Sequence, residues 1–227
     1  MSTLSFPPRP AAVLPAAALG LALASAALAH WPGAIELAAV AVLLARRTAA
    51  GSELGWTLGG GLLACGLGDL LLASQFKTAL LLMASGQALV ALALWSEAAG
   101  PGRRLWLAVG GVLPAWVAAV QVPQLPPSLA LIALLYCLAS AAMAGTALAR
   151  ALRWGGAPAW GLAAGAGLFI ASDALLTWDR YLSALPLAGV LVPGAYYASQ
   201  LLLAWHGRPM RLPADQVPVT PRRLPQA

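Results

Sequence analysis

Long apolar stretches alternate with short polar ones along almost the whole chain, up to about residue 206. The polar stretches and the two ends of the chain together hold most of the prolines and arginines. A run of about 20 apolar residues is the length that crosses a bilayer as a helix. The pattern therefore predicts eight membrane-spanning helices, at about 11–29, 33–45, 54–74, 77–96, 104–120, 128–149, 158–178 and 183–205.

The composition supports a membrane protein and excludes an ordinary soluble domain. Of the 227 residues, 61% are hydrophobic and only 9% are charged, whereas about a quarter of a soluble chain is charged. The expected fold class is an all-α, polytopic helical bundle. We expect a multi-pass integral membrane protein, in the plasma membrane or, in a bacterium, the inner membrane.

The basic residues predict how the bundle is oriented. With a cytoplasmic N-terminus and eight helices, the outside loops carry only Lys77 and Arg180, and the other eleven positive charges lie inside. An excess of Lys and Arg in cytoplasmic loops is typical of membrane proteins. Both termini are therefore expected on the cytoplasmic side. The net charge of +6 is explained by orientation, and we expect no nucleic-acid partner.

The chain is predicted to form one domain, residues 1–206, followed by a basic, proline-rich tail at 207–227 that is expected to be disordered and cytoplasmic. The domain shows signs of an internal repeat with an offset of 104 residues, at which Gly61 matches Gly165 and Asp69 matches Asp173. Each half, about 11–96 and 104–205, would hold four helices. An even number gives both halves the same orientation, as in a parallel repeat.

Asp69 and Asp173 are the most informative polar residues, because a carboxyl group inside an apolar helix is costly and usually functional. Their helices run in the same direction, so both are expected at similar depth, nearer the outer surface. The alternative is that each Asp only caps a broken helix or bonds a neighbouring helix. Tyr196 and Gln200 are four residues apart and share a helix face.

Several site types are excluded by residues that are missing from the apolar helices. His30 and His206 lie at helix ends, so a carboxylate–histidine zinc site is not expected. There is no GxSxG motif, which argues against a serine lipase. Cys65 and Cys137 lack metal-binding spacing and are interpreted as core residues. Any chemistry is left to carboxyl, amide and hydroxyl groups, without a metal or cofactor.

Three segments resemble the YhhN family, whose animal members are lysoplasmalogenases. They are Gly167-Leu-Phe-Ile-Ala-Ser-Asp-Ala-Leu-Leu176, Tyr196-Tyr-Ala-Ser-Gln200, and Gly66-Leu-Gly-Asp-Leu-Leu-Leu72. Tyr136, with Met143 and Ala144 after it, resembles the sixth helix of the family. The resemblance covers about 54–205, and the family also has eight helices.

Two departures from the family pattern fall outside these segments. Gln87 and Val90 stand in the fourth predicted helix, where the family commonly has a histidine and then a tyrosine. The Lys-Pro pair often found at the second helix of the family is absent. Gln87 is therefore interpreted as a residue that positions other groups.

The resemblance implies hydrolysis of the vinyl ether bond of a lysoplasmalogen, a lysophospholipid, to a fatty aldehyde and glycerophosphocholine or glycerophosphoethanolamine. One carboxyl group would protonate the alkene and a second would assist water, as paired carboxyl groups do in glycoside hydrolysis. Asp69 and Asp173 are the predicted catalytic pair. The candidate substrate-binding residues are Glu36, Gln87, Tyr136, Ser172, Tyr196, Tyr197 and Gln200.

Other functions also fit a membrane bundle with two buried acids. A small proton-coupled transporter would use the repeat and the acids for alternating access. A non-catalytic protein that binds membrane lipids would need neither acid for chemistry, and Glu36 would then be an interfacial charge. Another ether or ester lysolipid is an alternative substrate, and the oligomeric state stays open.

Overall fold

The computed structural model describes residues 53–72, 74–98, 100 and 103–208, together with Leu19 and Leu37. Glu36 and the tail beyond Arg208 lie outside these residues, as do the first two predicted helices apart from Leu19 and Leu37. Every regular element described is a helix. The helices are α3 (Glu53–Leu71), α4 (Phe76–Trp95), α5 (Arg103–Gln121), the 3-10 helix η2 (Val122–Gln124), α6 (Pro127–Trp154), α7 (Gly156–Tyr181) and α8 (Ala188–His206).

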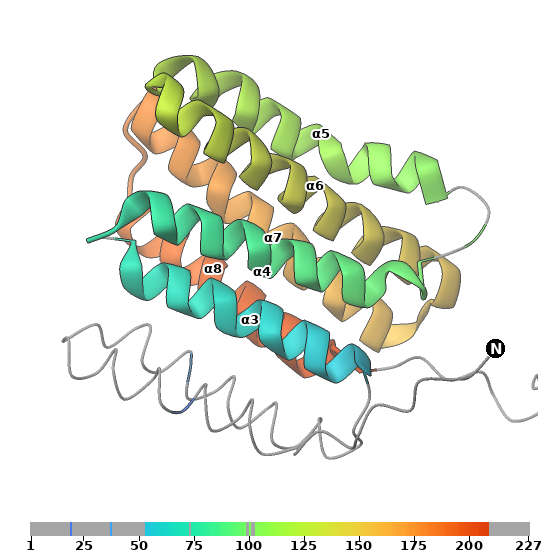
Figure 1. Ribbon diagram of the computed structural model, residues 1–227. Coiled ribbons are helices and arrows are strands. Elements are labelled where there is room, and N and C mark those ends of the chain that lie inside the picture. Colours follow the sequence, from blue (N-terminus) through green and yellow to red (C-terminus); the bar gives the residue numbers. More distant parts are fainter. Residues whose placement is uncertain are drawn as a thin grey trace, which may run out of the picture.

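The six α-helices lie side by side in a bundle, with α5 at one edge and α3 at the opposite edge (Figure 1). Helices consecutive in sequence pack together as the pairs α3–α4, α5–α6 and α7–α8. Helix α6 joins the pairs, because it also contacts α4 and α7. The core between them is filled by apolar side chains that are almost completely buried, among them Leu62, Leu94, Met143, Leu162 and Leu203.

Four of the helices in the described part are long and apolar enough to cross a membrane: α4, α5 continued through η2, α6 and α7. Their outward faces carry exposed leucines, such as Leu92 at 65% and Leu131 at 63% exposure. Exposed leucines on each of these four helices suit a hydrocarbon solvent, where they need no protein partner.

Glycines set the closest approach between paired helices. A side-chain carbon added to Gly61 of α3 would lie 2.7 Å from the Gly86 carbonyl oxygen of α4. One added to Gly110 of α5 would lie 2.5 Å from the Gly145 Cα atom of α6. Small residues at such crossings let two backbones touch, which is how helices associate in lipid.

The helix bounds agree with the predicted ranges to within three residues, except at two ends. Helix α6 was expected to end near 149 and continues to Trp154, so Arg150 lies inside the helix and does not begin a loop. Helix α8 was expected to start near 183 and starts at Ala188, after Leu187, whose φ of 61° is left-handed. The turn between α6 and α7 uses Gly155 and Gly156, with φ of 63° and 74°.

Candidate active site

Tyr136 and Asp173 form the central contact of the candidate site. The Tyr136 hydroxyl of α6 lies 3.0 Å from each carboxyl oxygen of Asp173 on α7 and donates its hydrogen bond to them. Tyr136 is buried and Asp173 is partly buried. A buried phenol aimed at a carboxyl group fixes the position of both groups.

Gln87 and Ser140 extend this contact to a third helix. The Ser140 hydroxyl of α6 donates to the Gln87 side-chain oxygen of α4 at 2.7 Å, and both residues are buried. The Gln87 side-chain nitrogen is buried and has no hydrogen-bond partner in the described part. Asp173, Tyr136, Gln87 and Ser140 together are called the aspartate cluster.

The orientation of the Gln87 amide follows from the Ser140 bond. In the structure the Ser140 hydroxyl donates to the amide oxygen, so the NH₂ group of Gln87 faces away from Ser140. Ser140 lies one helical turn after Tyr136, and residues four apart share a helix face. The sequence analysis missed Ser140, for which this spacing from Tyr136 was the available signal.

Asp69 contacts a different tyrosine from the one that bonds Asp173. The Tyr197 hydroxyl of α8 lies 3.4 Å from one Asp69 oxygen, which is long for a hydrogen bond between oxygens. The Tyr197 ring packs edge-on against the Tyr196 ring at 5.3 Å, and Tyr196 packs in the same way against Phe169 at 5.5 Å. Phe169 lies one turn before Asp173 on α7, so this aromatic row leads from Asp69 to the level of the aspartate cluster.

The remaining candidate residues on α7 and α8 are placed differently. Ser172 donates to the Val192 carbonyl oxygen of α8 at 2.8 Å, so it joins two helices and does not belong to the aspartate cluster. Gln200 and Ser199 are completely buried, and neither the Gln200 amide nor the Ser199 hydroxyl has a hydrogen-bond partner in the described part. Gln200 lies one turn after Tyr196, on the same buried face, as its spacing predicted.

A large apolar groove lies on another face of α7. Its volume is about 620 Å³, and it lies between α5 and α7, where Trp116 and Trp178 stack at 6.2 Å. Its α7 residues, Ala171, Ala174, Leu175 and Trp178, repeat at the spacing of one helix face. Asp173 projects about 200° around the helix from Ala171, so its carboxyl group points away from the groove.

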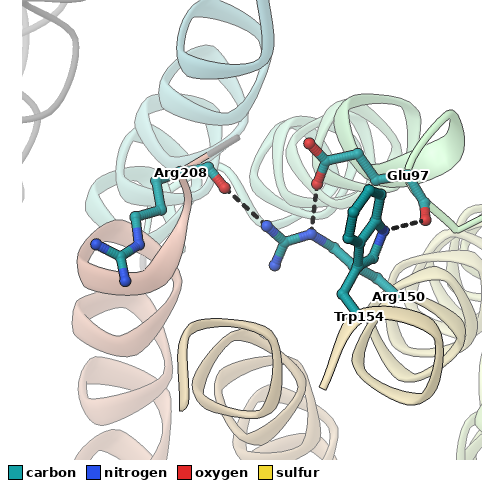
Figure 2. Close-up of polar contacts among 4 residues, drawn as sticks. All are labelled: Glu97, Arg150, Trp154 and Arg208. Carbon is teal, nitrogen blue, oxygen red and sulfur yellow. Dashed lines mark hydrogen bonds and ion pairs between the residues drawn. The ribbon is translucent and has the colours of Figure 1, made fainter. Parts of the chain in front are cut away.

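A second polar network lies near the far ends of α4, α6 and α8 (Figure 2). The Arg150 side chain is completely buried and pairs through Nε with Glu97 at 2.5 Å. Its Nη2 donates to the Arg208 carbonyl oxygen at 2.7 Å, and the Trp154 indole donates to the Glu97 carbonyl oxygen at 2.9 Å. Glu97, Arg150, Trp154 and Arg208 are called the Arg150 network.

The predicted sixth helix ended at 149, which placed Arg150 in the loop after it, whereas the structure places Arg150 inside α6. It is a helix residue that joins α4, α6 and the end of α8. Glu97, its partner 53 residues away, was not singled out in the sequence. Buried charges in proteins are normally paired in this way.

The described residues include no group of three His, Cys, Asp or Glu side chains that could hold a metal ion. The chemical groups of the candidate site are two carboxyl groups, three phenols and two amides, and the Ser140 hydroxyl bonds one of the amides. Such a set can donate and accept protons and can bind an oxygen-rich substrate.

Comparisons with known proteins give the following similarities. The family model described as the YhhN family matches residues 29–206. A 54-residue segment, 24% of this chain, is 46% identical to 22% of mouse lysoplasmalogenase TMEM86B. An 81-residue segment, 36% of this chain, is 40% identical to 32% of the pig protein of that name. Both matches cover less than two thirds of these relatives, and no solved structure matches this chain.

Proposed function

The chain belongs to the YhhN family, and from this premise we propose that it is a membrane hydrolase that cleaves the vinyl ether bond of a lysoplasmalogen. The products would be a fatty aldehyde and a glycerophospho-alcohol. Two relatives named lysoplasmalogenase support the substrate class. The single observation that supports the chemistry best is the hydrogen bond from Tyr136 to both oxygens of Asp173.

In the proposed reaction, Asp173 gives a proton to the alkene carbon that does not carry the oxygen. The carbon attached to oxygen becomes an oxocarbenium ion, to which water adds after losing a proton to Asp69. The resulting hemiacetal gives its hydroxyl proton to Asp173 and breaks its bond to the glycerol oxygen, which takes the proton held by Asp69. The aldehyde leaves, and both acids are back in their starting protonation states. One water molecule is consumed, and no metal or cofactor is needed.

The assignment of Asp173 as proton donor rests on its partner. A hydrogen bond to a charged acceptor is about twice as strong as one between neutral groups. The Tyr136 hydroxyl therefore gains strength as Asp173 loses its proton to the substrate. An interaction that is stronger in the transition state than in the ground state is the kind that accelerates a reaction.

Gln87 and Ser140 complete the proposed donor side of the site. Gln87 is held by the Ser140 hydroxyl and is proposed to position the Tyr136 phenol. The Tyr197 hydroxyl, the Tyr196 ring and Gln200 would line the path between the two acids. Glu36, outside the described residues, is proposed to contact the headgroup, and Ser172 to hold α7 against α8 next to the proton donor.

The finer architecture is part of the same proposal: residues 1–206 form one domain of eight helices, with both termini cytoplasmic and two related halves. The glycine contacts support the repeat. Gly61 meets α4 at Gly86, and its counterpart Gly165 meets α8, where an added carbon would lie 3.1 Å from the Leu203 backbone nitrogen. Cysteines introduced singly at Lys77 and Arg180 should then react with a membrane-impermeant reagent from outside the cell.

The test is aldehyde release, followed by mass spectrometry, from purified protein given lysoplasmalogen. The matched substrate is the saturated alkyl ether, which has the same headgroup and chain but no alkene to protonate. We expect aldehyde from the first only. Asp173→Asn should lower kcat by about 10²- to 10⁴-fold, the usual contribution of a general acid.

The control variant is Asp179→Asn, which makes the same change six residues further along α7. Asp179 accepts a hydrogen bond from the Leu185 backbone, so its loss tests a local structural effect. Rapid aldehyde release by folded Asp173→Asn protein would contradict the assignment. Uptake driven by a pH gradient without aldehyde would favour a transporter, and tolerance of Asp→Asn at both sites together with unchanged bound lipid would favour a binding protein.

A further inference from the structure

The end of the bundle that holds the Arg150 network is rich in arginine. Its described part holds five arginines, and Glu97 follows α4 at the same end. Glu97 is already paired with Arg150. The arginines, together called the arginine end, are Arg103, Arg104, Arg150, Arg153 and Arg208.

Two of these arginines are held against tryptophan rings. The Arg103 guanidinium lies 4.4 Å from the centre of the Trp95 ring, and that of Arg153 lies 5.1 Å from the centre of the Trp154 ring. A guanidinium over an aromatic ring keeps its N–H donors in its own plane, where they can bind an anion. Stacking also restricts the side chain, which lowers the entropy lost when it binds a ligand.

Arg103 and Arg153 are 50 residues apart in sequence but meet at one point, Gly100. The Arg103 backbone nitrogen donates to the Gly100 carbonyl oxygen at 3.3 Å. A side-chain carbon added to Gly100 would lie 3.8 Å from the Arg153 Cδ atom. Arg103 of α5 and Arg153 of α6 therefore both lie next to Gly100, a residue that has no side chain of its own.

Exposed leucines lie close in sequence to these arginines and tryptophans. Leu92 is 65% exposed, Leu105 is 58% exposed and Leu152 is 42% exposed, and each lies within three residues of one of the arginines or tryptophans of the stacks. The ring of Trp95 is also exposed. Arginines beside exposed leucines match a ligand with an anionic head and hydrocarbon chains, whereas a soluble phosphate would gain nothing from the leucines.

We propose that Arg103 and Arg153, stacked on Trp95 and Trp154, bind the phosphodiester headgroup of an anionic phospholipid such as phosphatidylglycerol. The guanidinium groups donate to the phosphate oxygens. The indoles lie at the headgroup level, the position that tryptophan favours in membranes. The lipid chains run along Leu92, Leu105 and Leu152. This site is separate from the aspartate cluster and does not depend on the proposed hydrolysis.

The experiment measures how many phosphatidylglycerol molecules stay bound to the purified full-length protein in native mass spectrometry, compared with phosphatidylcholine of the same chains. Wild-type protein should retain the anionic lipid in preference. The double variant Arg103→Gln/Arg153→Gln should weaken phosphatidylglycerol binding by about tenfold or more, because charge-assisted hydrogen bonds from both groups are lost.

The matched control is Arg104→Gln/Arg208→Gln, which removes the same charge from the same end. The Arg208 side chain is exposed and only its backbone carbonyl contacts Arg150, so the Arg150 network stays intact. The control should change binding by about twofold at most, as expected for exposed charges in salt. Equal losses from both double variants would show diffuse attraction to the membrane and would overturn the site.

Two further experiments test a soluble anion as the ligand and a double variant that keeps the positive charge. Inorganic phosphate and glycerophosphate at millimolar concentration should leave phosphatidylglycerol bound; displacement by either would show that the site takes a soluble anion. If the Gln variant does not fold, Arg103→Lys/Arg153→Lys keeps the charge but loses the stacked guanidinium groups. It should bind phosphatidylglycerol several-fold more weakly, and unchanged binding by the Lys variant would contradict the proposal.

Discussion

The aspartate cluster and the Arg150 network both place polar groups inside the bundle, but these groups have different kinds of partners. In the Arg150 network a buried cation meets a carboxylate at 2.5 Å and a backbone carbonyl at 2.7 Å. In the aspartate cluster the carboxyl group of Asp173 meets a neutral phenol, and beside it the Gln87 nitrogen has no hydrogen-bond partner in the described part. Paired charge holds helices together, whereas an acid surrounded by neutral donors can exchange a proton with a substrate.

This difference predicts that the two regions respond in opposite ways to substitution. Changes in the Arg150 network should lower the free energy of unfolding and leave the turnover of folded protein unchanged. Changes in the aspartate cluster should lower turnover with little effect on unfolding. Among changes in the aspartate cluster, the Asp173→Asn substitution described above should lower turnover most. Three further substitutions follow in order of expected effect.

Removing Arg150 should give the largest effect on stability. Arg150→Met leaves Glu97 without its buried partner, and breaking such a pair costs about 3–5 kcal/mol. The double variant Arg150→Met/Glu97→Leu removes both charges and should lose less than Arg150→Met alone. The measurement is thermal unfolding in detergent, with Arg104→Met as the exposed control. A double variant less stable than either single one would show that Arg150 acts through its other contacts.

Removing the phenol of the aspartate cluster should give the next effect, on turnover. Tyr136→Phe deletes a hydrogen bond to a carboxyl group that gains charge during the reaction, worth about 1.5–3 kcal/mol, or about 10- to 100-fold in kcat. Tyr181→Phe, at the end of α7, is the control for losing a hydroxyl. The measurement is the initial rate of aldehyde release by folded protein. Equal rates in the two variants would remove Tyr136 from the proposed mechanism.

Removing the hydroxyl that orients Gln87 should give the smallest effect. Ser140→Ala breaks one neutral hydrogen bond, worth about 1 kcal/mol, so kcat should fall about fivefold while KM changes little. Ser199→Ala is a matched control, because Ser199 is as buried as Ser140 and its hydroxyl has no hydrogen-bond partner in the described part. Steady-state kinetics separate the two constants. A change in KM alone would mean that Ser140 affects binding and not the chemical step.

The described helices could be predicted from the sequence because apolar runs of this length have few alternatives in a membrane. The two poorly predicted ends have specific causes. Arg150 marks the end of an apolar run in the sequence, yet α6 continues past it because Glu97 neutralises its charge. Leu185 and Leu187 look like part of the last helix, but Leu187 adopts a left-handed φ of 61° and α8 starts after it.

The residues of the candidate site could be singled out from the sequence, but the contacts between them could not. Asp69 and Asp173 stand out because acids are rare in apolar helices. Their different tyrosines could not be assigned, because Tyr197 and Asp69 are 128 residues apart in sequence and both tyrosines are compatible with either acid. Ser140 was missed because a serine in a membrane helix costs little, and only its 2.7 Å contact with Gln87 distinguishes it.

The close crossing of α5 and α6 at Gly110 and Gly145 has a consequence for how the protein is handled. Only Pro114 and Val117 of α5 are buried, so this helix has few side chains that anchor it to the bundle. Because lipid chains are as apolar as leucine, α5 is held to the bundle by close van der Waals packing and not by the hydrophobic effect. Lipid or detergent molecules around α5 compete directly for its packing against α6. We expect short-chain detergents that fit between the two backbones to detach α5 before any other described helix.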